Sequence, residues 1–200
     1  MLIAFEGLDQ SGKATQTRQL RARLEQHGCK VHTLSFPDYE TPIGREIRSA
    51  LDDERNFAAD VMQLLYVANR FEHKARIDSW LANGAIVICD RYRASSVAYG
   101  EAQGLDPAWL ESMQHPLPAP EVTIYLDIAP ETGVRRKSAG RDLYERDLSL
   151  LVRVRASYRR QAAQPDWVLV NAELPPDHVA DIVMRAIQPR LSPSSNPARS

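Results

Sequence analysis

One short segment near the amino terminus constrains the fold of this chain more than any other. An apolar run over residues 2–5 leads into Gly7-Leu8-Asp9-Gln10-Ser11-Gly12-Lys13-Ala14-Thr15. The two glycines and the lysine have the spacing of a phosphate-binding loop between a strand and a helix. In such a loop, backbone N–H groups and a helix N-terminus face phosphate oxygens, and the lysine adds a mobile positive charge. We therefore expect residues 7–15 to bind a nucleotide polyphosphate.

Two residues of this loop are unusual. Ala14 follows Lys13, where the pattern has a Ser or Thr whose hydroxyl contacts Mg²⁺. Thr15 lies roughly 100° further around the helix, so it does not automatically replace that hydroxyl. Asp9 places a carboxylate among phosphates, which is repulsive unless it meets a cation or a hydroxyl. Asp9 therefore faces a second ligand or a metal, or else caps the following turn.

Composition limits the class of protein. The chain has 200 residues, a net charge of −1 and 44% hydrophobic residues, which suits one soluble domain. No apolar run approaches the roughly 18 residues of a membrane span, and no signal-peptide pattern is present. Cys29 and Cys89 form neither a disulfide framework nor a metal-site spacing. We expect a cytoplasmic protein, and the charge gives no support for a membrane or nucleic-acid partner.

Strands and helices alternate along the chain. Apolar runs predict strands over 2–6, 31–35, 85–89, 122–128 and 167–170. Helices are expected over 13–27, 42–51, 57–83, 92–103, 130–137 and 176–187. One further helix begins at 107, and another follows the stretch 138–143 and ends at about 163. This order predicts an α/β fold of three layers, with a five-stranded parallel sheet and helices on both faces. Ligands should lie at the carboxyl ends of the strands.

Two details of this assignment concern segment ends. Asn56 is the expected N-cap of the 57–83 helix. Residues 189–200, rich in Pro, Ser and Asn, are expected to form a disordered tail after a single domain over 1–188.

Asp90 and Arg91 come directly after the expected strand over 85–89. An acid at this end of a strand, beside a phosphate loop, commonly holds Mg²⁺ through water. The neighbouring guanidinium can neutralise a phosphoryl group bidentately. An Asp–Arg pair is often only structural, but its place beside the loop favours a function here.

Two further clusters allow two interpretations each. Tyr66 and Arg70 share a face of the 57–83 helix, where a ring and a guanidinium suit a base and its carbonyl edge. Spacing alone favours a core tyrosine and a surface arginine. The basic residues 135–137 flank an irregular stretch, 138–143, that is followed by further charges. That region is either a solvated helix face or a mobile lid that brings arginines onto a transferring phosphate.

The sequence resembles the thymidylate kinase family along nearly all of residues 1–188. Seven segments carry the resemblance, in the family's order and approximate spacing: Phe5 to Gln16, Phe36-Pro37, Ala68 to Glu72, Asp90-Arg91-Tyr92, Leu117-Pro118 with Pro120, Tyr125-Leu126-Asp127 with Pro130-Glu131, and Tyr144-Glu145. Each segment alone is weakly specific, whereas together they are highly specific.

The resemblance implies a P-loop NTPase-type fold and a single nucleoside monophosphate kinase domain over 1–188, with a lid at about 136–147. The implied reaction transfers the γ-phosphoryl of ATP to dTMP with Mg²⁺, in nucleotide biosynthesis. It also implies a homodimer, for which the 57–83 helix is a candidate surface. ATP and dTMP are then the binding partners.

The resemblance also implies roles for individual residues. Lys13 and the loop amides would bind ATP phosphates, and Arg136 would pack on adenine. The expected dTMP-binding residues are Asp9 at the sugar 3′-hydroxyl, Tyr66 and Arg70 at thymine, Arg91 at the phosphate near Phe36 and Tyr39, Ser95 and Ser96 near the base, and Tyr99 under the sugar.

The family divides by the position of its catalytic arginine. Some members carry it in the phosphate loop, where this chain has Gln10. The arginine should therefore come from the lid, which includes Arg141, Asp142 and Glu145, and Arg141 is the best candidate. Lys13, Arg91, Arg141 and Asp90 form the expected catalytic set. Because Ala14 lacks a hydroxyl, we expect nucleotide oxygens and waters to hold most of the Mg²⁺, with Asp90 and Asp9 in its outer shell.

Three alternatives stay open. Another nucleoside monophosphate kinase, acting on cytidylate or adenylate, is disfavoured by Phe36-Pro37 and by the Tyr66, Arg70 and Tyr99 set. A nucleotide-switched regulator would usually carry an Asn-Lys-x-Asp guanine motif, which the sequence lacks. A nucleic-acid-binding ATPase would predict a basic surface, which the net charge does not support.

Overall fold

The computed structural model describes residues 1–136, 144 and 147–191. Five parallel strands form one sheet in the order β2-β3-β1-β4-β5. Their bounds are β1 (Leu2–Glu6), β2 (Val31–Ser35), β3 (Ile86–Asp90), β4 (Val122–Asp127) and β5 (Trp167–Asn171). The predicted α/β fold with a five-stranded parallel sheet is confirmed.

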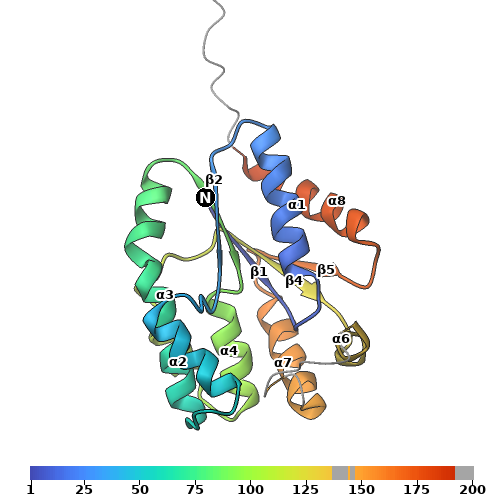
Figure 1. Ribbon diagram of the computed structural model, residues 1–200. Helices are drawn as coiled ribbons and strands as arrows, with labels where there is room; N and C mark the ends of the chain where they lie inside the picture. Colours follow the sequence, from blue (N-terminus) through green and yellow to red (C-terminus); the bar gives the residue numbers. More distant parts are fainter. Residues whose placement is uncertain (137–143, 145–146, 192–200) are drawn as a thin grey trace, which may run out of the picture.

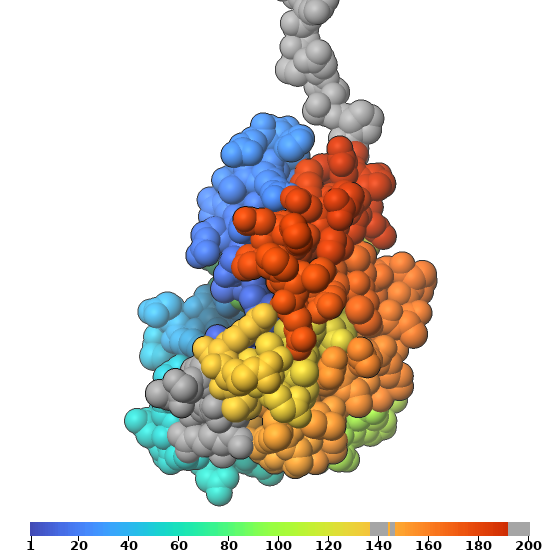
Figure 2. Space-filling model, turned by 90° about the vertical axis from the view of Figure 1, so that its right-hand side faces the viewer, coloured from blue at the N-terminus to red at the C-terminus, as the bar shows by residue number. Residues whose placement is uncertain are grey.

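Helices cover both faces of this sheet (Figure 1). On one face α1 (Lys13–Gln26) lies beside α8 (Pro176–Ile187), as Figure 2 also shows. The other face carries α3 (Ala59–Ala82), α4 (Arg93–Ala102) and α7 (Leu148–Gln161). The shorter helices α2 (Pro42–Leu51), α5 (Pro107–Ser112) and α6 (Pro130–Arg136) pack against α3, α4 and α7, respectively. No helix in the described ranges is long and apolar enough to cross a bilayer.

The central strand β1 is buried on both sides. Ile3 and Phe5 belong to the core that includes α1, whereas Leu2 and Ala4 pack in a second cluster with Ile77 of α3. This double burial explains the continuous apolar run that precedes the phosphate loop. It also fixes the loop at the centre of the carboxyl edge, because β3 and β4 pair with β1 on either side.

Predicted and observed segment ends agree to within two residues, but two expectations about these ends are wrong. Helix α3 begins at Ala59 rather than Phe57, and its N-cap is Ala58, without a side-chain hydrogen bond, so Asn56 does not cap it. The expected disordered tail is wrong at its first residues, because Gln188–Arg190 form a short 3₁₀ helix. Residues 192–200 lie outside the described part.

Candidate active site

The phosphate loop joins the end of β1 to the start of α1. Gly7 and Gly12 have φ angles of 145° and 94°. A Cβ at Gly7 would lie 2.6 Å from the carbonyl oxygen of Leu126, so only glycine fits there. The Lys13 ammonium bends back over the loop and donates to the carbonyl oxygens of Gly7 (3.2 Å) and Leu8 (2.9 Å). Burial, and next the charge of Arg91, lower the pKa of Lys13.

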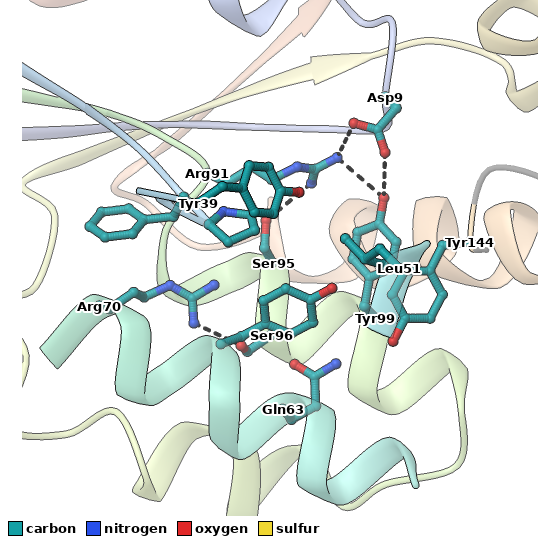
Figure 3. A pocket seen from close by; sticks show the side chains of 13 residues that line it. Asp9, Tyr39, Leu51, Gln63, Arg70, Arg91, Ser95, Ser96, Tyr99 and Tyr144 are labelled. Carbon is teal, nitrogen blue, oxygen red and sulfur yellow. Dashed lines mark hydrogen bonds and ion pairs between the residues drawn. The ribbon is translucent and has the colours of Figure 1, made fainter. Parts of the chain in front are cut away.

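Two neighbouring cavities open at the carboxyl edge of the sheet. The first, called here the loop cavity, is lined by Lys13, Ala14, Thr15 and Asp90. The second, the aromatic cavity, lies between α3 and α4 and contains Arg70 and Tyr99 (Figure 3). Tyr66 also lines it. Among the described residues, five line both cavities: Asp9, Phe36, Pro37, Tyr39 and Arg91. A ligand in one cavity therefore meets a ligand in the other at these shared residues.

Arg91 occupies the junction of the two cavities. Its Nη2 donates to Asp9 Oδ1 at 2.8 Å, and its guanidinium lies 5.3 Å from the ring centroid of Tyr99. The Tyr99 hydroxyl in turn donates to Asp9 Oδ2 at 3.5 Å. Burial opposes the charge of Arg91, but Asp9 and Tyr99 outweigh it and raise the arginine pKa well above its ordinary value. The guanidinium is thus a fixed cation at the junction of the two cavities.

Arg70 lies deep in the aromatic cavity, on the α3 face it shares with Tyr66. Only 2% of it is exposed, and its Nη1 donates to Ser96 Oγ (2.8 Å) and Gln114 Oε1 (3.1 Å). Its Nε has no hydrogen-bond partner among the described residues. Burial lowers the pKa of Arg70. The surface position that spacing alone favoured for Arg70 is therefore wrong. Ser96 and Gln114, from distant parts of the chain, provide hydrogen-bond acceptors that allow it to be buried.

The Phe36-Pro37 end of the aromatic cavity is held against α3 by one buried asparagine. The Asn69 Oδ1 accepts from the Asp38 N–H at 2.8 Å, and its Nδ2 donates to Thr41 Oγ1 at 2.8 Å. Close packing reinforces this contact, since a Cβ at Gly44 would lie 1.7 Å from the Asp38 carbonyl oxygen. The segment between β2 and α2, which carries Phe36 and Tyr39, is thereby placed over the cavity.

Comparison with known proteins decides the family. A family model described as thymidylate kinase matches residues 5–183, a range that contains both cavities. The chain belongs to the thymidylate kinase family.

Individual members of the family align over most of their length. The thymidylate kinase of Plasmodium falciparum is 36% identical over 171 residues, covering 85% of this chain and 81% of the relative. That of Thermomicrobium roseum is 38% identical over 197 residues, covering 92% and 93%. The solved thymidylate kinase of Candida albicans superposes with a TM-score of 0.81 at 28% identity, covering 94% of this chain and 91% of that one.

The residues that the family resemblance singled out gather in these cavities. The nine expected substrate-binding residues all line the aromatic cavity: Asp9, Phe36, Tyr39, Tyr66, Arg70, Arg91, Ser95, Ser96 and Tyr99. Of the expected ATP-binding residues, six line the loop cavity: Asp9, Gln10, Gly12, Lys13, Ala14 and Thr15. Gly7, Leu8 and Ser11 complete the loop behind them, and Leu8 and Ser11 are buried.

Of the expected lid, about 136–147, the structure describes Arg136, Tyr144 and Asp147. Arg136, at the end of α6, donates to the carbonyl oxygens of Gln10 (2.9 Å) and Ala172 (3.1 Å). This places it beside the phosphate loop and the end of β5. Arg141, Asp142 and Glu145 lie outside the described residues.

Sequence reasoning missed several residues of the site. Gln63 lines the aromatic cavity, fully buried, and neither atom of its amide has a hydrogen-bond partner in the described part of the chain. It shares the α3 face of Tyr66 and Arg70, three and seven residues further on, and this spacing was the available signal. Leu51 and Tyr144 also line the cavity. Tyr144 belongs to a segment that carries the family resemblance, but no role was expected of it.

The loop cavity has a donor set that fits Mg²⁺. Asp9 and Asp90 both line it, and both offer carboxylate oxygens. Magnesium is commonly bound by one or two carboxylates together with substrate phosphates. Asp9 is engaged by Arg91, which leaves Asp90 as the more available carboxylate. Ala14 lines the same cavity without a hydroxyl to contribute.

Proposed function

We propose that this protein transfers the γ-phosphoryl group of ATP to dTMP and so forms dTDP and ADP. The observation that carries the proposal is the junction of the loop and aromatic cavities at Asp9 and Arg91. A donor phosphate on the loop and an acceptor phosphate in the aromatic cavity would meet there. Family membership supports this reaction over other uses of a phosphate loop.

ATP is proposed to occupy the loop cavity. Its phosphates would displace the loop carbonyls as partners of the Lys13 ammonium, which gains a stronger, charged acceptor. Arg136, beside the loop and the end of β5, is the proposed contact for adenine.

The acceptor nucleotide is proposed to bind in the aromatic cavity. Arg91 would hold its phosphate, and Tyr66 would stack on thymine. Arg70 has only hydrogen-bond donors, so it suits a carbonyl oxygen of the base rather than an amino group. Tyr99, which lines this cavity, is proposed to disfavour a 2′-hydroxyl, and Asp9 would accept from the 3′-hydroxyl.

Repulsion between two anions is the main obstacle to this reaction, so the protein contributes chiefly alignment and positive charge. Lys13 and Arg91 would supply positive charge on the donor and acceptor sides. The proposed lid, about 136–147, would add Arg141 and exclude water, which could otherwise accept the phosphoryl group. Bound Mg²⁺ would supply further charge at the phosphate oxygens.

A direct assay tests the proposal. ATP is offered with dTMP, dUMP, CMP or AMP, and ADP release is followed. We expect dTMP to be the preferred acceptor, although broad substrate specificity is described for the Candida albicans relative. Preference for CMP or AMP would favour another nucleoside monophosphate kinase. Slow ATP hydrolysis that no acceptor stimulates would favour a nucleotide-switched regulator.

Asp90 should set the magnesium requirement. Because Ala14 offers no hydroxyl, the Asp90→Asn variant loses a major protein contact to the ion's water shell, and half-maximal activity should need about tenfold more Mg²⁺. Activity is measured over a magnesium titration at fixed ATP. Asp166→Asn, which lies outside both cavities, is the control. An unchanged magnesium profile in Asp90→Asn would contradict the assignment.

We further propose a homodimer in the cytoplasm that is built on α3. Three exposed apolar side chains share one face of this helix: Val61 (38%), Leu64 (49%) and Phe71 (37%). Such a stripe is typical of a protein contact surface.

Leu64→Glu should convert the dimer into a monomer, because it places a charge in the middle of this apolar face. Molar mass is measured by light scattering after gel filtration. Val152→Glu is the matched control, since Val152 is as exposed (50%) but lies on α7. A dimer that survives Leu64→Glu, or a wild-type monomer, would rule out this surface.

A further inference from the structure

Glu6 is a fully buried carboxylate at the end of β1, directly before the phosphate loop. It accepts hydrogen bonds from the backbone N–H groups of Tyr92 (2.9 Å) and Ser95 (3.3 Å). It also accepts from two hydroxyls, Ser95 Oγ at 2.6 Å and Tyr158 OH at 3.1 Å. Within the described ranges it forms no ion pair with a lysine or arginine. Four hydrogen bonds from the start of α4 and from α7 therefore take the place of a cation partner in the described part of the chain. A buried carboxylate is costly unless it accepts such hydrogen bonds.

The two hydroxyls that contact Glu6 are also the partners of Arg91. The Arg91 Nη1 donates to Ser95 Oγ at 3.2 Å and to Tyr158 OH at 3.3 Å. A hydroxyl has one proton to donate and lone pairs to accept. The Ser95 and Tyr158 oxygens also lie 2.8 Å apart, so their two protons are shared between Glu6 and this contact, and their lone pairs accept from the guanidinium. Burial, and next the charge of Glu6, raise the pKa of Tyr158 well above its ordinary value, so this hydroxyl keeps its proton.

Glu6 also fixes the backbone after Arg91. Arg91 has a φ of 63°, a left-handed conformation that costs free energy in a non-glycine residue and persists only where its surroundings hold it. The next residue, Tyr92, is the N-cap of α4 and provides no side-chain cap. The Glu6 carboxylate caps the start of this helix instead, because it accepts from the N–H groups of Tyr92 and Ser95. Arg91 is thus constrained at its side chain and at its backbone by one carboxylate.

We propose that Glu6 is a positioning residue for Arg91, which it holds in place for the acceptor phosphate through Ser95, Tyr158 and the start of α4. This inference rests on the proposed function, because it takes the group that Arg91 binds to be the acceptor phosphate. It couples the strand that begins the phosphate loop to the acceptor side of the site. None of these contacts involves Lys13, the residue proposed to hold ATP on the donor side.

Removing the charge of Glu6 should change the affinity for the acceptor in opposite directions if Glu6 positions Arg91 and if it acts only through its electrostatic field. The negative charge of Glu6 acts on Lys13 and Arg70, where it offsets part of the lowering of pKa that burial causes. Removing this charge makes the cavity more positive, which by itself would tighten the binding of a phosphate. If Glu6 positions Arg91, its removal must instead weaken the binding of the acceptor.

The first test uses Glu6→Gln, which keeps the shape of the side chain but replaces one acceptor oxygen with a donor. We expect the KM for dTMP to rise about tenfold while the KM for ATP changes less than about twofold. Glu101→Gln is the matched control, because Glu101 accepts from Ser157 and Arg160 of α7 at the far end of α4. It should leave both KM values unchanged. An unchanged or lower KM for dTMP in Glu6→Gln, or an equal rise for both substrates, would overturn the inference.

A second variant keeps the inference testable if Glu6→Gln does not fold. Tyr158→Phe removes one bridging hydroxyl, and the KM for dTMP should rise about threefold. Tyr125→Phe is its control, since Tyr125 is equally buried and stacks on Tyr158 but donates to Asp127 outside the cavities. The double variant Glu6→Gln/Tyr158→Phe should lose less than the product of the single effects. Independent effects, or no effect of Tyr158→Phe, would overturn the inference.

These outcomes are distinguishable from failure of the proposed function. If the wild-type protein does not phosphorylate dTMP, the function itself fails. If the wild type is active and the Glu6 and Tyr158 variants keep its KM for dTMP, only the positioning role fails.

Discussion

Replacing Lys13 by methionine should lower kcat/KM by about a thousandfold or more, because the variant loses the charge that the loop brings to the donor phosphates. The fold should be unaffected. Among the described residues the Lys13 ammonium donates hydrogen bonds only to loop carbonyls, and burial already disfavours its charge. Methionine has a similar length and is more easily buried. Turnover is measured with ATP and dTMP, and folding by circular dichroism and thermal unfolding.

A matched lysine variant separates the local charge from the net charge of the protein. Lys30→Met removes the same charge from an exposed position outside both cavities and should keep full activity. Near-normal turnover in Lys13→Met would refute its assignment to the donor phosphates. Loss of activity together with loss of the folded state would instead assign Lys13 a structural role.

Local sequence patterns were sufficient to predict the phosphate loop and the positions of the strands along the chain. The loop is specified by glycine positions and one lysine within a few residues, and a strand buried on both faces is a continuous apolar run. The positions of Asp90 and Arg91 at the end of β3 followed from the same logic. Segment ends were less predictable, as Asn56 illustrates, because capping depends on local backbone geometry.

Contacts between distant segments could not be predicted from spacing. Arg70 is buried because Ser96 and Gln114 provide acceptors, and neither residue is near it in the sequence. From the sequence alone, Glu6 could not be distinguished from any other residue at a strand end. Its four hydrogen-bond donors come from residues 92–158, far along the chain. The family resemblance had assigned Arg70 and Ser96 to one pocket. It named Glu6 only within the matching motif and gave no reason for a buried carboxylate there.

Arg91→Lys should reduce kcat/KM for dTMP by about a hundredfold or more, although it keeps the positive charge. The guanidinium uses Nη2 for Asp9 and Tyr99 and Nη1 for Ser95 and Tyr158. A lysine ammonium is a point charge on a flexible stem and cannot reproduce this fork. The KM for dTMP should rise and kcat should fall, because the acceptor phosphate is both held and aligned by this group. Steady-state kinetics with each substrate varied in turn measure both effects.

The neighbouring Arg93 provides the control for this substitution. Arg93→Lys makes the same chemical change two residues along the chain, outside both cavities, and should leave dTMP kinetics unchanged. Because Glu6 is inferred to act through the guanidinium of Arg91, adding Glu6→Gln to Arg91→Lys should cause little further loss. A full further rise in the KM for dTMP, equal to that of Glu6→Gln alone, would mean that Glu6 acts on the acceptor by a route that does not pass through Arg91. Wild-type kinetics in Arg91→Lys would remove Arg91 from the acceptor site altogether.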